Sequence, residues 1–206
     1  MRTSELKGLI IATMTGMQEH AEELRALDAA LGDGDLGITT MSGAKAIIAA
    51  LDEVPDDASP AQVAKSCAKA FANANPSTMA ALVAGALLAG SKVWDEDELG
   101  YQDARAFAEA AAASISTRGK SQVGDKTILD AMVPAVEALQ RVSDPDEGLR
   151  AAIVAARGGV ADSTPLQSRR GRAAWLQERS IGLPDPGATA FVRLLEEIES
   201  ARTDAA

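Results

Sequence analysis

The sequence is poor in aromatic residues, positive charge and cysteine, and each shortage excludes a class of protein. Only 3% of the 206 residues are aromatic, and the formal net charge is -10. A nucleic-acid-binding protein needs stacking side chains and a positive surface, so we expect no nucleic-acid partner. A single cysteine, Cys67, excludes an intrachain disulfide framework and a multi-cysteine zinc site, which is typical of a reducing compartment such as the cytoplasm.

Histidine is equally scarce, with His20 as the single example. Ser-His-Asp and Cys-His catalytic sites need a histidine, and most zinc and non-haem iron sites do too. His20 falls within a predicted helix, and we interpret it as structural. The chemistry that remains uses carboxylates, hydroxyls, backbone amides and arginines, which are the groups that bind magnesium and phosphate.

The sequence also lacks a long apolar run and an export signal. Its longest apolar stretch, Met79 to Gly90, is shorter than the roughly 20 residues that cross a bilayer. The N-terminus has no uninterrupted apolar segment followed by a small-residue cleavage site. We therefore expect a cytoplasmic protein with no membrane partner.

Apolar residues recur every three or four positions along most of the chain, which predicts helices. Residues 1–30 predict one amphipathic helix, and further helices are expected at 38–51, 61–73, 78–93, 103–116, 126–140, 146–161 and 188–201. No alternating strand pattern, linker or repeat interrupts this series. Short connections favour antiparallel neighbours, so we predict a single all-α domain over residues 1–206, an antiparallel up-and-down eight-helix barrel or bundle.

Three carboxylates, Asp28, Asp33 and Asp35, crowd the stretch LDAALGDGDLGITT at residues 27–40. Asp28 continues the apolar face of its helix, where an unpaired carboxylate is costly. Together the three suit Mg²⁺, which prefers oxygen ligands, although a solvated Asp/Gly turn is the alternative. We predict that the next helix begins at about Thr39, where its free amides would favour a phosphate, unless Thr39 is an ordinary cap.

A second stretch, RGKSQVGDKTILD at residues 118–130, superficially resembles a Walker A loop. The match fails because an aspartate precedes Lys126 where the pattern requires glycine, and because a helix precedes the loop. Thr127 and Asp130 match a variant capping box, and a capping threonine can still bind phosphate.

A third stretch, SRRGRAAWLQERSIGLPDPGA, concentrates arginines within residues 158–187, which are polar and irregular in our prediction. Such a long irregular stretch is more often functional than idle. Arginine forks suit phosphate oxygens, and a surface helix with salt bridges is the alternative. Elsewhere, Ser77 and Thr78 follow Pro76 at a predicted helix start, and capping alone would explain them.

Together, the motifs GDGDLG, RGKSQVGDKTILDA and RRGRAAWLQERSIGLPDPGA resemble those of the nucleotide-binding L subunits of bacterial dihydroxyacetone kinases. The matches are in the family's order and span residues 28–188. The resemblance implies an eight-helix barrel that binds ADP or ATP and two Mg²⁺ ions at one end. It also implies phosphoryl transfer to a small ketose, either dihydroxyacetone or a related sugar such as a tetrulose.

The resemblance also assigns roles by position. It implies that Asp28, Asp33 and Asp35 bind the metal ions, and that these aspartates and Arg172 carry catalysis. The positions that match the family's nucleotide contacts are Leu36, Gly37, Ile38, Thr39, Ser77, Thr78, Gly119, Thr127, Ile128, Arg172, Pro184, Asp185 and Pro186.

The partners implied are a separate K-type subunit that holds the ketose and, where bound ADP is rephosphorylated in place, a phosphotransferase-system phosphocarrier subunit. Two alternatives remain: a domain of the fatty-acid kinase type, and a non-catalytic, ADP-loaded co-regulator of a transcription factor.

Two departures from the family pattern bear on the acceptor. Leu36 stands where the family usually has histidine, and Asn75-Pro76-Ser77-Thr78-Met79 replaces a glycine-rich loop. Backbone without a Cβ atom approaches a ligand most closely, so the lost glycines should reshape the phosphate cradle. These departures favour a divergent member with another small ketose as its acceptor.

Overall fold

The chain forms two compact units of α-helices. The computed structural model describes residues 1–204, which form nine α-helices and one 3-10 helix with no strand. Unit 1 contains Met1–Glu19, Thr39–Gly119 and the chain from Glu197, and unit 2 contains His20–Ile38 and Lys120–Glu196. The predicted all-α class is confirmed.

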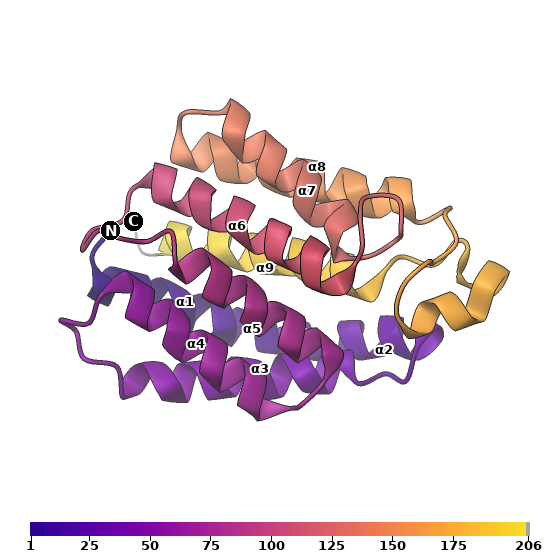
Figure 1. The fold of residues 1–206 in the computed structure, drawn as a ribbon, viewed down its shortest axis with the longest axis horizontal. Coiled ribbons are helices and arrows are strands. Elements are labelled where there is room, and N and C mark those ends of the chain that lie inside the picture. The colour runs from indigo at the N-terminus through magenta and orange to yellow at the C-terminus, as the bar shows by residue number, and fades with distance from the viewer. Residues whose placement is uncertain (205–206) are drawn as a thin grey trace. The chain divides into compact units, whose positions relative to one another are not determined.

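Most of the helices of unit 1 are consecutive in the chain and joined by short connections. Ser59 and Gln62 form a capping box at the start of α4, with a proline at the first helical position. Figure 1 shows α4, α5 and α6 side by side, as expected for such connections. The helices of this unit are α1 (Thr3–Glu19), most of α3 (Leu36–Asp52), α4 (Pro60–Ala74), α5 (Thr78–Ser91) and α6 (Tyr101–Gly119).

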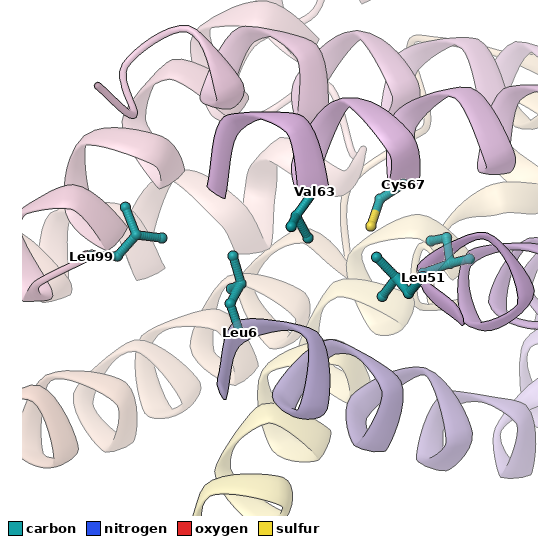
Figure 2. Close-up of a cluster of buried hydrophobic side chains, with 6 residues drawn as sticks. Leu6, Leu51, Val63, Cys67 and Leu99 are labelled. Carbon is teal, nitrogen blue, oxygen red and sulfur yellow. The ribbon is translucent and has the colours of Figure 1, made fainter. Parts of the chain in front are cut away.

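The core of unit 1 is aliphatic, in keeping with the low aromatic content of the chain. Leu6 of α1, Leu51 of α3, and Val63 and Cys67 of α4 point toward one another, and Leu99 lies beside them (Figure 2). Each of these side chains is at most 6% exposed. Cys67 is a free thiol and serves as a small residue of this core.

Unit 2 contains α2 (Ala21–Leu31), α7 (Ile128–Arg141), α8 (Pro145–Ser163), the 3-10 helix η1 (Arg172–Ser180) and most of α9 (Pro186–Asp204). Helices α7 and α8 pack closely along their lengths (Figure 1). At Gly159 of α8, a Cβ atom would overlap the backbone carbonyl oxygen of Asp130 on α7. A glycine at this position is what lets the two backbones approach so closely.

Three boundaries differ from the sequence prediction. The helix predicted over residues 1–30 is interrupted at His20, where α1 ends and α2 begins, although no proline marks the break. Helix α3 begins at Leu36, earlier than the predicted Thr39. The stretch predicted to be irregular, residues 158–187, contains the end of α8 and the whole of η1. Within the described residues, no helix has the length and apolar character to cross a membrane.

Candidate functional site

The three aspartates of the first motif converge in unit 2. Asp28 lies in the last turn of α2, and Asp33 and Asp35 lie in the loop that connects α2 to α3. Each offers a carboxylate oxygen, and these oxygens lie within 4.8 Å of one another. Asp28 and Asp35 are half-buried, whereas Asp33 is exposed. Gly34, with φ of +74°, supplies the left-handed turn that brings the two loop carboxylates back toward the helix.

Asp28 also fixes the start of α3. Its carboxylate accepts a hydrogen bond from the Leu36 N–H at 3.2 Å, so it satisfies one of the amides left unpaired at a helix start. Gly37 lies against α2 so closely that a Cβ atom would overlap the carbonyl oxygen of Ala21. Leu36 and Gly37 are buried in this first turn, and Ile38 is exposed. The acidic cluster is therefore held by the contact between α2 and the first turn of α3.

Arg172 supplies a positive charge to the acidic cluster. This first residue of η1 forms ion pairs with Asp33 and, at 3.3 Å, with Asp35. Burial raises the pKa of the Asp35 carboxyl, and the nearby Asp28 carboxylate raises it further. A site that concentrates carboxylates with partial desolvation favours a bound cation. The structure thus brings together the four residues to which the sequence assigned catalysis.

The acidic cluster has the donor set of a hard cation. Its ligands would be carboxylate oxygens from Asp28, Asp33 and Asp35, which is the chemistry that Mg²⁺ prefers. Among the described residues, Arg172 is the one cationic side chain paired with Asp33 and Asp35, so the cluster retains net negative charge to attract a divalent ion. The residues present therefore fit magnesium.

Thr127 and Ile128 lie at the start of α7, also in unit 2. Thr127 is the N-cap residue: its hydroxyl accepts from the Leu129 N–H at 3.2 Å, and its own N–H donates to the Asp130 carboxylate at 2.7 Å. The predicted capping box is confirmed. Asp130 also accepts from the Gly124 N–H at 2.7 Å, so one buried carboxylate organises the loop that precedes α7.

Pro184, Asp185 and Pro186 form the turn that leads into α9. The Asp185 carboxylate accepts from the Ala188 N–H at 2.8 Å and so caps the helix. Desolvation is the main reason that the pKa of Asp185 rises to about 7, and the Asp130 carboxylate adds to it. The turn is therefore held by the cap of α9 and lies near the buried carboxylate of Asp130.

The remaining predicted residues belong to unit 1. Ser77 caps α5 by accepting from the Ala80 N–H at 3.1 Å, and Thr78 is the exposed first residue of that helix. Thr39 is buried in α3, where its hydroxyl accepts from the Asn75 side-chain amide at 2.8 Å. Gly119 is the last residue of α6. Asn75 thus ties the α4–α5 connection to α3 within unit 1.

Lys126 is the residue whose importance the sequence did not reveal. Its side chain is 1% exposed, and its ammonium group donates to three backbone carbonyls near η1. A lysine in a polar Gly/Asp loop is ordinarily solvated, and no local pattern distinguishes a buried one. The one available signal was the combination of Lys126 with a capping aspartate four residues later, in a loop that is not a Walker A loop.

Comparison with known proteins links these features to a family. A model of the DAK2 domain matches residues 30–200 of the chain. The L-erythrulose 1-kinase of Mycolicibacterium smegmatis is 33% identical over 199 residues, which cover 92% of this chain and 34% of that protein. This chain therefore spans about a third of the length of that relative.

A second relative is close to this chain in length. The ADP-binding subunit DhaL of PEP-dependent dihydroxyacetone kinase 2 from Listeria innocua is 31% identical over 189 residues, covering 88% of this chain and 87% of the subunit. The corresponding DhaL subunit of Escherichia coli is 29% identical over 195 residues, covering 88% of this chain and 89% of that subunit.

A solved structure shares the fold. The dihydroxyacetone kinase from C. freundii, in complex with AMP-PNP and Mg²⁺, matches with a TM-score of 0.75 and 21% identity, covering 97% of this chain and 34% of that one. Its native form matches with a TM-score of 0.76. This likeness shows the all-α fold and extends over nearly all of the chain.

Proposed function

The chain belongs to the DAK2 domain family, and from this premise we propose that it binds ADP or ATP and transfers the phosphoryl group in a dihydroxyacetone-kinase-like enzyme. Residues 1–206 would act together as one nucleotide-binding domain. The observation that carries the proposal is the convergence of Asp28, Asp33 and Asp35 beside Arg172.

Magnesium ions, two by analogy with the family, would be held by the three aspartates. When bound, they supply positive charge that neutralises the β- and γ-phosphate oxygens of the nucleotide. The C. freundii kinase, which shares this fold, was solved with AMP-PNP and Mg²⁺, and this supports the choice of ligands. The Asp28 carboxylate also holds the first turn of α3 through Leu36, so metal ligation and loop shape depend on the same side chain.

Arg172 would stabilise the negative charge of the transferring phosphoryl group. Its guanidinium already lies at the carboxylates proposed to hold the metal, and its planar fork suits phosphate oxygens. Catalysis by this chain is then mostly positioning and charge stabilisation. The acceptor hydroxyl and its base would come from the partner subunit.

The remaining nucleotide contacts follow from the family match. Amides and hydroxyls at Leu36 to Thr39 and at Ser77 and Thr78 would approach the phosphates. Gly119, Thr127 and Ile128 would contact the nucleotide, and the turn at 184–186 would form the pocket rim. Helix starts at α3, α5 and α7 support this assignment, because their first amides favour anions.

We propose a small ketose as the acceptor, held by a K-type subunit. The relatives named for dihydroxyacetone and for L-erythrulose support this class, and the erythrulose kinase supports a tetrulose. Leu36, in place of the usual histidine, is consistent with an acceptor other than dihydroxyacetone. For a chain that keeps its ADP bound, a phosphotransferase-system phosphocarrier would restore the ATP, as the PEP-dependent relatives' names indicate.

Turnover in a reconstituted system tests the proposal. The chain is mixed with a K-type subunit, Mg·ATP and either dihydroxyacetone or L-erythrulose, and sugar phosphate is measured. We expect product that depends on this chain and on Mg²⁺, and that is lost in Asp33→Asn but retained in the control Asp57→Asn, an exposed aspartate of unit 1. Absence of sugar phosphate with every ketose, despite bound nucleotide, would favour a binding-only role.

A further inference from the structure

Lys126 lies in the loop before α7, and its ammonium group is enclosed by backbone oxygens. It donates to the carbonyl oxygens of Thr164 at 2.9 Å, Leu166 at 2.8 Å and Ser180 at 2.6 Å. An ammonium group has three donors, so each of them has a partner within the protein. The lysine is therefore committed to the fold and does not present its charge to a phosphate.

The three carbonyl oxygens belong to the two ends of one loop, residues 164–182, which we call the arginine segment. Thr164 and Leu166 follow α8, and Ser180 is the last residue of η1. The Gly182 N–H donates to the Thr164 carbonyl oxygen at 3.0 Å, so the ends of the segment meet at a neck. Lys126, which lies outside the segment, joins both sides of this neck.

Asp125 holds the arginine segment at a second place. Its backbone carbonyl accepts from the Arg169 N–H at 3.0 Å, and its carboxylate accepts from Arg170 Nε at 2.9 Å. Within the segment, the Ser180 hydroxyl accepts from the Ser168 N–H at 2.9 Å. Two adjacent residues before α7 thus fix the path of a loop that starts nearly forty positions later.

The backbone of Lys126 is itself specialised. Its φ of +60° lies in the left-handed region, which residues with a Cβ atom seldom adopt. Such a conformation persists where surrounding contacts over-determine it, and it is concentrated at functional sites. Here the contacts are the three hydrogen bonds of the ammonium group.

We infer that Lys126 is a positioning residue: by clamping the neck of the arginine segment, it holds Arg172 opposite Asp33 and Asp35. Arg172 lies within that segment and pairs with both carboxylates. All of these residues belong to unit 2. That this placement serves nucleotide binding rests on the proposed function. The clamp itself does not depend on the proposed function.

A first test measures the clamp without any ligand. Trp175 lies on η1 and is 82% exposed, and the only other tryptophan, Trp94, is removed by Trp94→Phe to give a parent that reports on the arginine segment alone. In this parent, Lys126→Met should increase the nanosecond motion of Trp175, measured by fluorescence anisotropy decay. The matched control is Lys7→Met, because Lys7 is a lysine of unit 1 that also donates to a backbone carbonyl, that of Val54.

A second test measures the effect on nucleotide affinity by calorimetry with Mg·ADP. Lys126→Met should weaken Mg·ADP binding about tenfold or more. The substitution removes three hydrogen bonds from a charged group, which are among the stronger ones, and so releases the segment that carries Arg172. In an Arg172→Ala background, Lys126→Met should weaken the Mg·ADP affinity by no more than about a further twofold. Both substitutions would remove the same contribution, that of a correctly placed Arg172. Lys7→Met should lower the melting temperature and leave the affinity unchanged.

The outcomes separate this inference from the proposed function. Unchanged Trp175 motion, unchanged Mg·ADP affinity, or losses that add fully to those of Arg172→Ala would overturn the clamp. If the protein that keeps Lys126 binds no Mg·ADP, the proposed function is contradicted. The fluorescence test needs no ligand, so its result still decides whether the clamp exists. For a Lys126→Met protein that does not fold, Lys126→Gln replaces it in both tests with effects in the same direction, because an amide has only two donors for the three carbonyl oxygens and carries no charge.

Discussion

The guanidinium of Arg172 lies 3.3 Å from the carboxylate of Asp35, although the two residues are 137 positions apart in the chain. The same guanidinium is paired with Asp33. It therefore occupies carboxylate oxygens that would also bind a metal ion. Under the proposed function, the arginine and a metal ion would compete for these oxygens until a bound nucleotide offers its phosphates to the arginine.

This competition predicts opposite effects of Arg172→Ala on two affinities. Without nucleotide, the variant should bind Mn²⁺, as a substitute for Mg²⁺, roughly two- to fivefold more tightly, because a half-exposed ion pair no longer opposes the metal. With nucleotide, it should bind Mg·ADP more weakly. Calorimetry measures both. Equal weakening of metal and nucleotide binding would show that Arg172 supports the shape of the cluster and does not compete for it.

The contact between α2 and α3 predicts that Gly37→Ala is destabilising. The new Cβ atom would overlap the Ala21 carbonyl oxygen, so the backbone must move, at a cost of about 1–3 kcal/mol or more in the free energy of unfolding. The control is Gly8→Ala on α1, where a Cβ atom meets nothing within 4 Å.

Urea denaturation distinguishes the two glycines of that comparison. Gly8→Ala should raise stability by about 0.5–1 kcal/mol, because alanine loses less backbone entropy in a helix. If Gly37→Ala were as stable as Gly8→Ala, the close approach of α2 and α3 would not exist in solution.

The raised pKa of Asp185 predicts that stability falls as pH rises. The carboxyl has a pKa of about 7 in the folded protein, against about 3.9 in an unfolded chain. At pH values between these two, Asp185 is therefore protonated in the folded protein and ionised in the unfolded chain. The free energy of unfolding should therefore decrease from pH 5 to pH 8, by on the order of 1 to 4 kcal/mol from this group. Asp185→Asn keeps an acceptor for the Ala188 N–H and should remove this part of the decrease.

Urea unfolding of the wild type and Asp185→Asn at several pH values gives the measurement. The difference between the two proteins should grow with pH and favour the variant at pH 8. A difference that stays constant from pH 5 to pH 8 would mean that Asp185 has an ordinary pKa in the folded state.

The thiol of Cys67 can be used as a chemical probe of whether the core of unit 1 opens in the native protein. It is 3% exposed in the aliphatic core, and burial raises the pKa of its thiol to about 12, so little reactive thiolate forms at neutral pH (Figure 2). A chromogenic disulfide reagent should leave the folded protein unlabelled and react promptly in denaturing urea. Prompt labelling of the native protein would show that the core around α1, α3 and α4 opens readily.

Local pattern predicted most of the helices, because they carry apolar residues at helical spacing and several begin at a recognisable cap, such as Ser59 or Thr127. The break at His20 was not predictable, since the periodicity continues through it without proline. The early start of α3 escaped prediction because its cap, Asp28, is eight residues before Leu36 in the chain. Such a cap depends on tertiary contact and has no local signature.

The same distinction holds for the candidate site. The crowding of aspartates in one short loop was visible in the sequence, because all three are close in the chain. The pairing of Arg172 with Asp33 and the burial of Lys126 depend on how distant segments pack, and arginine and lysine are ordinarily solvated. The family resemblance singled out Arg172, whereas no local pattern showed that Lys126 would be buried.

The most direct measurement is the affinity for ADP by calorimetry, with and without Mg²⁺, in the wild type, Asp35→Asn and the exposed control Asp57→Asn. The wild type and the control should bind ADP at least about tenfold more tightly with Mg²⁺, and Asp35→Asn should lose this dependence. Its melting temperature should not fall, because the Asp35 carboxylate is partly desolvated beside Asp28. ADP affinity that is independent of Mg²⁺ in the wild type would contradict the proposed function.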